Sequence, residues 1–338
     1  MFPTRAFRAA MLASAAALSA CTLQHRPQQL AASHATPMDD HMAHMSVADM
    51  AAPAVDPAAA VLPQGHPGLP ASANSAAARL AASPRHAEWV KIAWTPGSAD
   101  SLMAWVVYPV TDRAHSPVVV IVHEIFGLTT WVRAVADQAA AEGFIAIAPD
   151  LNSRVRGGPS ADELPADSAV KLIRGVPVAD RNLGISAAAR YAMALPSAAS
   201  RYAVIGFCWG GSTTWGYAVS GGVPGYAGGV AFYGTPYMQG AVPDGDSLAR
   251  ISAPVMLLSG SKDARIGAAM PAIDSAMHAL GKDYFGRNYP GAIHGFMRAQ
   301  DDPRTQQRDP GEERANLTAA EDAWPRTVAF LHRQLNGR

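Results

Sequence analysis

Alternation between apolar and polar positions opens the folded part of this chain. Residues 89–94 and 103–109 alternate with a period of two, which predicts antiparallel strands at the start of a sheet. Further along, short continuous apolar runs predict strands that are buried on both faces. These runs cover residues 118–123, 144–148, 202–207, 229–233, 255–259 and 284–289.

Helical patterns separate the buried runs. They cover residues 131–142, 179–194, 211–220, 268–280 and 319–335. Strands and helices that alternate at this spacing imply right-handed crossovers between parallel strands. The predicted fold class is therefore α/β, with a doubly wound, mostly parallel sheet and helices on both of its faces.

A sharp turn joins one predicted strand to the next helix. The pentapeptide Gly206-Phe207-Cys208-Trp209-Gly210 follows the apolar run 202–205 and precedes a helix start at 211–215. A strand, a Gly-x-nucleophile-x-Gly turn and a helix form the nucleophile elbow of α/β-hydrolases. Glycines are needed because the turn is too tight for side chains and the nucleophile holds strained backbone angles. The alternative is a small buried thiol at a strand end.

Two further residues follow in the order that this elbow requires. Asp263 comes just after the apolar run 254–260, and His294 comes after residues 284–289. Both lie past a predicted strand, where a parallel sheet presents its chemistry. The order nucleophile, Asp, His is that of α/β-hydrolases. We therefore expect Cys208, Asp263 and His294 to form a catalytic triad.

Several motifs in register resemble the dienelactone hydrolase family. The strand and loop at 118–128 contain Glu124-Ile125-Phe126-Gly127, which is similar to the mark of that family at this position. The resemblance covers about residues 88–335. It implies an α/β-hydrolase fold, carboxylic ester hydrolysis of the carboxymethylenebutenolidase type and the same triad. The other matching segments are Ala148-Pro149-Asp150-Leu151 with Arg154, residues 206–211, Asp263 and residues 294–296.

The residue types support acyl transfer through a thioester. Cys208 would attack an ester or lactone carbonyl as thiolate, while His294 relays the proton and Asp263 fixes the histidine tautomer. The backbone N–H groups of Ile125 and Trp209 are expected to hold the oxyanion. We expect no cofactor and no metal ion.

The resemblance also implies roles for two charged residues. It implies that Glu124 contacts the resting thiol and helps to generate the thiolate when substrate arrives. A surface carboxylate or a structural hydrogen-bond acceptor is the alternative for this residue. Arg298, four residues beyond His294, would bind the carboxylate of an acidic substrate, because a guanidinium suits two-point binding. Its alternative is a solvated loop arginine.

The rest of the family's anion site has no clear counterpart. The family carries an arginine and a tyrosine on the helix after the position of Asp150, whereas residues 162–171 are acidic in this chain. We therefore expect a small ester or lactone other than dienelactone as substrate. A broad-specificity carboxylesterase of the same fold and a non-enzymatic envelope lipoprotein remain the alternatives.

Composition agrees with an enzyme built around one core. The chain has 338 residues, of which 27 basic side chains balance 27 acidic ones, so we expect no nucleic-acid partner. An apolar fraction of 49% is ample for one sizeable core.

The amino-terminal segment has the features of a lipoprotein signal peptide. Arg5 and Arg8 precede an apolar stretch at 9–17, which is shorter than the roughly 20 residues that span a bilayer. Leu18-Ser19-Ala20-Cys21 then resembles a bacterial lipobox, which predicts lipidation of Cys21. Plain secretory cleavage after Ala20 is the alternative. Acylation would anchor the chain to a lipid membrane of the bacterial cell envelope, facing the periplasm or the exterior.

A tether is predicted between this anchor and the enzyme. Residues 22–82 are rich in Ala, Pro, Ser, Met and His and show no sustained apolar period. The expected organisation is a signal peptide at 1–20, a flexible tether at 21–82 and a hydrolase domain at 83–338.

Histidine and methionine gather within the tether. Imidazole and thioether groups suit copper, particularly Cu(I), in an oxidising compartment. Compositional drift in a linker is the simpler explanation, because spacing alone defines no closed set of ligands. The residues are His34, Met38, His41, Met42, His44, Met45 and Met50.

Overall fold

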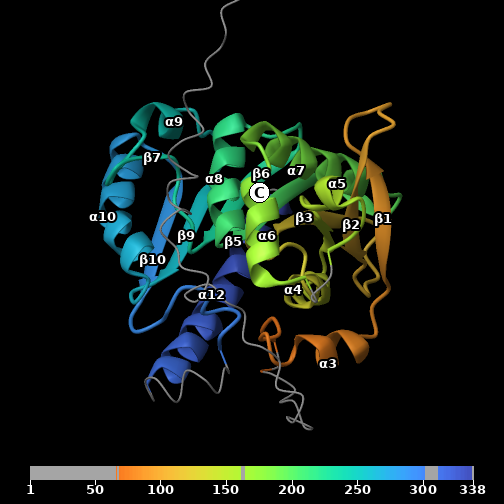
Figure 1. The fold of residues 1–338 in the computed structure, drawn as a ribbon, viewed down its shortest axis with the longest axis horizontal. Helices are drawn as coiled ribbons and strands as arrows, with labels where there is room; N and C mark the ends of the chain where they lie inside the picture. The colour runs from red at the N-terminus through yellow and green to blue at the C-terminus, as the bar shows by residue number, and fades with distance from the viewer. Residues whose placement is uncertain (1–65, 67, 161–163, 301–310, 337–338) are drawn as a thin grey trace, which may run out of the picture. The chain divides into compact units, whose positions relative to one another are not determined.

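An eight-stranded sheet forms the centre of the protein, seen in a computed structural model that describes residues 66, 68–160, 164–300 and 311–336. Its strands are β1 (Ala87–Ala93), β2 (Ser101–Val107), β3 (Ser116–Val122), β4 (Ile145–Pro149), β5 (Ala198–Phe207), β6 (Tyr226–Phe232), β9 (Val255–Gly260) and β10 (Tyr284–Tyr289). They lie in the order β1-β2-β4-β3-β5-β6-β9-β10 across the sheet (Figure 1). β2 pairs antiparallel with β1 and with β4, and all the other neighbours pair in parallel.

These strands occupy the segments that the hydrophobic pattern predicts. The alternating segments form β1 and β2, and each continuous apolar run forms a parallel strand. β3 is buried at every position because elements cover both faces of the sheet there. The α/β fold class and the mostly parallel sheet are confirmed.

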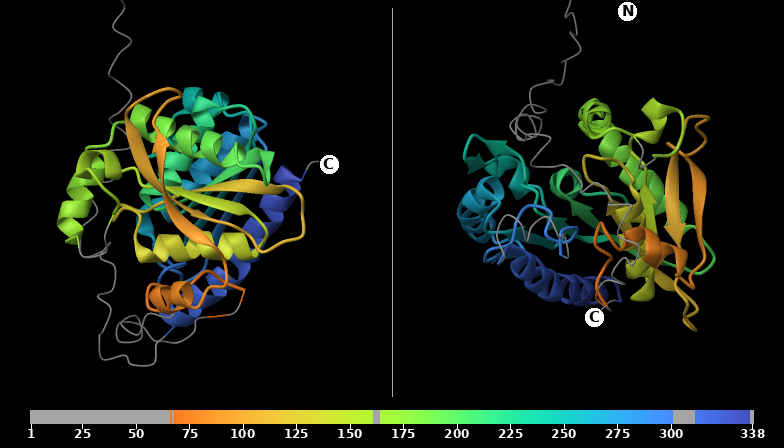
Figure 2. Two further views of the ribbon diagram at one scale, coloured as in Figure 1. Left: turned by 90° about the vertical axis from the view of Figure 1, so that its right-hand side faces the viewer. Right: turned by 60° about the horizontal axis from the view of Figure 1, so that its bottom comes forward.

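Helices cover the two faces of the sheet. Their bounds are α3 (Ala76–Ala81), α4 (Thr130–Ala141), α5 (Ser153–Arg156), α6 (Ala166–Arg174), α7 (Val178–Met193), α8 (Trp209–Ser220), α9 (Gly245–Ala249), α10 (Ala264–Ala279) and α12 (Glu312–Leu335). α7 and α8 pack on each other and on the central strands, and Figure 2 shows α4 and α12 on the opposite face. A small hairpin, β7 (Met238–Gln239) and β8 (Val242–Pro243), follows β6.

The parallel pairing brings distant segments to one edge of the sheet. β3, β5, β6, β9 and β10 run in the same direction. Their carboxyl ends therefore meet along this edge, where ligands bind in open α/β sheets. The segments that follow these strands hold every residue predicted for the catalytic site.

The expected boundary between tether and domain falls too late in the chain. Residues 68–82 include α3 and the buried side chains of Leu69, Ala71 and Ala76. The Trp131 Nε1–H group donates a hydrogen bond to the Ala71 carbonyl oxygen at 2.8 Å. The segment packs through small side chains and backbone groups, so no apolar period marks it in the sequence. It belongs to the domain.

The signal peptide, Cys21 and the His/Met group lie outside the described residues. Within the described part of the chain, no helix is both long and apolar enough to cross a membrane. The anchor therefore stays a prediction.

Candidate active site

Cys208 sits in a strained turn between β5 and α8. Its backbone angles are φ 56° and ψ −117°, which are sterically costly for a residue with a side chain. The turn closes only with glycine on both sides. A Cβ on Gly206 would lie 1.9 Å from the Gly210 carbonyl oxygen, and one on Gly210 would lie 2.4 Å from the Val122 carbonyl oxygen. The packing of these glycines thus fixes the thiol at the end of β5.

Asp263 and His294 form a close pair at the same edge. Asp263 follows β9 and caps α10, where its Oδ1 accepts a hydrogen bond from the Ile266 N–H at 3.3 Å. Its Oδ2 lies 2.5 Å from Nδ1 of His294, which comes from the loop after β10. Because the carboxylate accepts the Nδ1 proton, Nε2 is the atom left for proton transfer.

Charge on the neighbouring groups favours the imidazolium form of His294. Burial opposes that charge, but the charges of Cys208 and Asp263, with the hydrogen bond to Asp263, raise the pKa of His294 to about 10. Burial likewise opposes ionisation of Asp263, yet His294 holds its pKa below the ordinary value. The Nε2 atom and the thiol interact electrostatically, although no hydrogen bond of full geometry joins Nε2 to any described residue. The arrangement suits an imidazolium that can give its Nε2 proton to a group bound beside Cys208.

The loop after β3 lies directly against the elbow. The rings of His123 and Trp209 stack with centroids 5.7 Å apart and an angle of 9° between their planes. Ile125 and Trp209 are both buried. The two backbone segments predicted to supply the oxyanion donors are therefore neighbours beside Cys208.

His123 holds this loop in shape, a role that the sequence pattern did not reveal. Its Nδ1–H group donates to the Glu124 carbonyl oxygen at 2.7 Å, and its Nε2 accepts from the Leu151 N–H at 3.1 Å. Burial lowers the pKa of His123, so the ring stays neutral and can both donate and accept. The sequence offered one indication of this role: His123 is the last residue of the predicted strand 118–123, which ends at the edge of the sheet that holds the catalytic residues.

Glu124 and Arg298 meet inside the site. Oε2 of Glu124 lies 3.5 Å from Nη1 of Arg298, and the two side chains are only 4% and 10% exposed. The guanidinium also lies over the Phe126 ring, 5.3 Å from its centroid. Glu124 is thus no surface carboxylate, and Arg298 is no solvated loop residue. The sequence placed both near the site but did not predict their pairing.

Residues 68–82, at the amino-terminal end of the domain, bind the loop that carries Arg298. The Ala73 N–H donates to the Arg298 carbonyl oxygen at 2.9 Å. Nε2 of Gln300 donates to the carbonyl oxygens of Pro70 at 3.0 Å and Met297 at 2.8 Å. This amino-terminal segment therefore helps to position the arginine.

Tyr233 is a further site residue that the sequence pattern left unassigned. It follows β6, is 1% exposed, and has its ring centroid 4.9 Å from that of His294. As with His123, the available signal was its position at the end of a predicted strand, 229–233.

Arg154, part of the motif after β4, is engaged elsewhere. Its guanidinium pairs with Asp180 at 2.9 Å and with Asp100, and it lies over the Trp94 ring 4.4 Å from the centroid. These contacts hold the side chain against acidic groups, so it does not supply a second cation beside Arg298.

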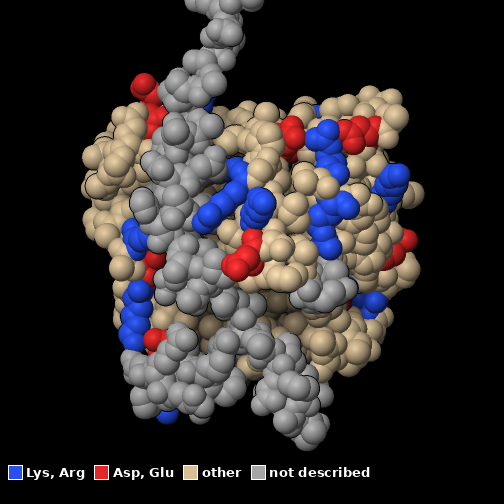
Figure 3. Space-filling view, viewed as in Figure 1, with Lys and Arg blue, Asp and Glu red and all other residues tan. Residues whose placement is uncertain are grey.

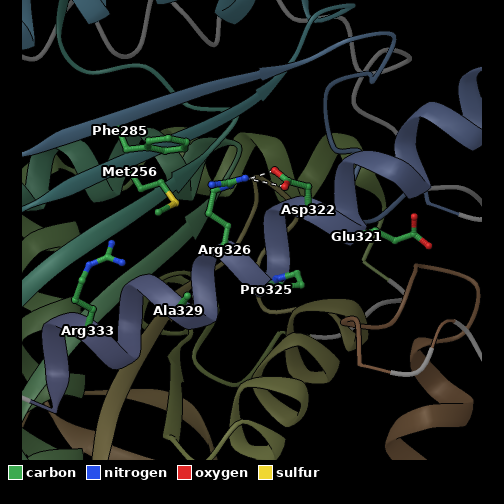
Figure 4. Close-up of a pocket in the computed structure, with 8 residues that line it drawn as sticks. All are labelled: Met256, Phe285, Glu321, Asp322, Pro325, Arg326, Ala329 and Arg333. Atoms are coloured by element: carbon green, nitrogen blue, oxygen red, sulfur yellow. Dashed lines mark hydrogen bonds and ion pairs between the residues drawn. The ribbon is translucent and has the colours of Figure 1, made fainter.

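A separate hollow lies between α12 and the last two strands (Figure 4). It is lined by Met256 and Phe285 and by an Arg326–Asp322 ion pair of 2.7 Å. Met256 is near the amino end of β9, whereas Asp263 follows the carboxyl end, so this hollow is remote from the catalytic edge. On the face in Figure 3, basic and acidic side chains are interspersed. The residues predicted for catalysis lie instead at the edge that holds Cys208.

Fold and site together define the class of protein. A strained residue in a strand–turn–helix elbow, followed in the chain by an acid and then a histidine, is the arrangement of α/β-hydrolases. Within that class, the model of the dienelactone hydrolase family matches residues 102–335. The chain belongs to the dienelactone hydrolase family.

Individual relatives agree with this membership. A Salmonella typhimurium protein named "Putative carboxymethylenebutenolidase" is 29% identical over 272 residues, which cover 79% of this chain and 96% of that protein. The solved structure of a "Putative Dienelactone Hydrolase" from Klebsiella pneumoniae is 26% identical with a TM-score of 0.59, covering 73% of this chain and 99% of that chain. Pyrococcus horikoshii acylaminoacyl peptidase is 16% identical with a TM-score of 0.51, covers 74% of this chain and 42% of its own, and shares the fold alone.

Proposed function

We propose that this family member hydrolyses a small carboxylic ester or lactone through a Cys208–His294–Asp263 triad and a thioester acyl-enzyme. The observation that carries the proposal is the strained thiol beside a His294–Asp263 pair of 2.5 Å. The names of the relatives support the same class of reaction. Hydrolysis of p-nitrophenyl acetate by the wild-type chain, and its loss in Cys208→Ala, tests the function.

Each group has a defined part in the reaction. The sulfur of Cys208 attacks the carbonyl carbon, and the charge that develops on the carbonyl oxygen is held by the N–H groups of Ile125 and Trp209. The C–O bond breaks, and the leaving oxygen takes the proton from Nε2 of His294. Water then gives a proton to His294 and attacks the thioester, which releases the acid and restores the thiolate. Asp263 stabilises the imidazolium in both halves of the cycle.

The substrate class that the site favours is an ester or lactone with a nearby carboxylate. Such a group would compete with Glu124 for Arg298, because both bind the guanidinium through carboxylate oxygens. Glu124 would then be released toward Cys208 and would take the proton of the resting thiol, which leaves the attacking thiolate. The thiol regains this proton from Glu124 when the product leaves. Arg154 is tied to other carboxylates, so Arg298 is the arginine to which we assign the anion site. Dienelactone itself is therefore not the preferred substrate.

Replacing Arg298 with alanine should weaken catalysis on acidic substrates alone. We expect kcat/KM for monomethyl glutarate to fall about tenfold to a hundredfold, mostly through KM, because one charge-assisted contact is lost. A neutral ester such as methyl butyrate should be affected far less. Arg298→Lys should recover only part of the loss, because lysine cannot make the planar two-point contact. Equal losses on both esters would show instead that Arg298 supports the His294 loop.

A broad-specificity carboxylesterase is the second candidate. The existing Glu124–Arg298 pair favours it, because a neutral ester could react without separating these charges. The non-enzymatic alternative with a copper-binding tether rests on residues outside the described part of the chain. A wild-type enzyme that prefers neutral over acidic esters would favour the carboxylesterase.

We also propose that Cys21 anchors the enzyme to a membrane of the bacterial cell envelope, on the basis of the lipobox. Cells that express the chain and receive a palmitate analogue should label the wild type, and Cys21→Ser should remove the label. Cys208→Ser is the matched control, because it removes the other cysteine and should leave labelling unchanged. Labelling that survives Cys21→Ser would contradict the anchor.

A further inference from the structure

The backbone around Tyr233 is built against the nucleophile. The Cys208 N–H donates to the Phe232 carbonyl oxygen at 3.0 Å, and a Cβ on Gly234 would lie 2.8 Å from the Cys208 carbonyl oxygen. Tyr233, between these contacts, has a φ of 39°, a left-handed conformation that is uncommon for a bulky residue. Strain of this kind persists where the surroundings fix it, and it gathers at functional sites.

The Tyr233 side chain is enclosed, yet its hydroxyl is unsatisfied. Its ring centroid lies 4.9 Å from that of His294, 5.5 Å from Phe296 and 6.3 Å from Phe207. The buried hydroxyl makes no hydrogen bond with any residue in the described part of the chain. Buried tyrosine hydroxyls ordinarily find a partner. A hydroxyl held in this way beside a catalytic pair is available to a bound molecule.

The charges around the hydroxyl keep it a proton donor. Burial and the charge of Glu124 raise the pKa of Tyr233 well above its ordinary value, Arg298 opposes this, and Cys208 adds to it. The phenol therefore remains neutral at any working pH. The charges that act on the hydroxyl are thus those of Glu124, Arg298 and Cys208, the groups assigned to the reaction.

The order of the strands in the sheet places Tyr233 on one side of Cys208 and the oxyanion loop on the other. The oxyanion loop follows β3 on one side of β5, whereas Tyr233 follows β6 on the other side, next to β9 and Asp263. A bound ester can point its carbonyl oxygen to the β3 loop and its leaving oxygen toward β6 and β9. That is also the side from which His294 must protonate the leaving oxygen.

We propose that Tyr233 is a further catalytic residue, whose hydroxyl donates a hydrogen bond to the leaving oxygen as the ester C–O bond breaks. The bond electrons pass to that oxygen, which takes its proton from Nε2 of His294, and the acyl carbon stays on the sulfur of Cys208. Tyr233 keeps its own proton throughout. This inference rests on the proposed ester hydrolysis and adds a group to its first step.

Tyr233→Phe, assayed with two acetate esters, tests the role. The esters share one acyl group, so their kcat/KM values compare the breaking of the two C–O bonds. Ethyl acetate releases a strongly basic alkoxide, and we expect its kcat/KM to fall about tenfold to a hundredfold. The p-nitrophenolate of p-nitrophenyl acetate needs little help, so we expect a loss below about threefold.

Tyr226→Phe is the matched control. Tyr226 begins β6 at the end opposite to Tyr233, and its buried hydroxyl also lacks a hydrogen-bond partner among the described residues. The Tyr226→Phe variant should keep the wild-type kcat/KM for both acetate esters. Tyr226→Phe and Tyr233→Phe should both unfold at the wild-type temperature.

Three results would overturn the role: an equal loss on both esters, no loss on either, or a loss confined to KM for a carboxylated ester such as monomethyl glutarate. The last would make Tyr233 part of the anion site instead. A wild-type enzyme inactive on both acetate esters would contradict the proposed function itself, and the inference with it. A flat response of Tyr233→Phe in an active enzyme contradicts the inference alone.

Discussion

Replacing Cys208 with alanine should reduce ester hydrolysis by about 10⁵-fold or more, since removal of a catalytic nucleophile has effects of this size. In the proposed reaction the sulfur carries the acyl group, and the His294–Asp263 pair cannot take over that task. Cys208 is the free cysteine of the described residues. Steady-state rates with p-nitrophenyl acetate measure the loss.

The alanine variant should keep its fold. The change removes one buried atom, whose loss costs on the order of 1 kcal/mol of the free energy of unfolding. Thermal unfolding followed by circular dichroism checks this. Cys208→Ser should keep a small part of the activity. A hydroxyl is a nucleophile, but the catalytic base is adapted to a thiol and not to a hydroxyl. Full activity in the alanine variant would disprove the assignment.

Asp263→Asn should lower kcat/KM by about 10³–10⁴-fold, the size seen when a triad histidine loses its carboxylate. The carboxylate accepts the Nδ1 proton at 2.5 Å and is one of the charges that raise the pKa of His294 to about 10. An amide cannot stabilise the imidazolium, so the pKa of His294 should fall. His294→Ala should cost at least as much, because it removes the proton donor itself.

The pH profile separates this role from a structural one. In the proposed reaction the leaving oxygen takes its proton from the imidazolium, so we expect activity below the pKa of His294 and its loss above that pKa. In the wild type this alkaline decline should therefore lie near pH 10. In Asp263→Asn it should move to lower pH by about one unit or more, because a charge partner is lost. An unmoved alkaline decline in the variant would contradict the ion-pair account.

Much of the fold follows from apolar patterning because the sheet is buried on both faces. β3 is a continuous run of apolar residues, and its parallel neighbours show the same signal. The elbow can also be predicted from the sequence, because its glycines cannot be replaced. A Cβ on Gly206 or Gly210 would lie only 1.9 or 2.4 Å from a backbone carbonyl oxygen. Chain order then identified Asp263 and His294.

The features that escaped prediction depend on tertiary contacts. Residues 68–82 pack through alanines and backbone hydrogen bonds, which leave no apolar period. The Glu124–Arg298 pair joins loops far apart in sequence. Tyr233 has a positive φ although it is not a glycine, so its residue type does not signal this conformation. Local pattern cannot report contacts that only the folded sheet creates.

The central claim is that the acyl group passes through Cys208, and mass spectrometry of acid-quenched enzyme tests it most directly. Enzyme stopped during turnover of p-nitrophenyl acetate should carry one acetyl group, located on the peptide that contains Cys208 and removed by hydroxylamine. Slowed variants such as Asp263→Asn help if deacylation of the wild type is too fast to observe. An acetyl group on another residue, or turnover without any acetyl adduct in these enzymes, would contradict the account.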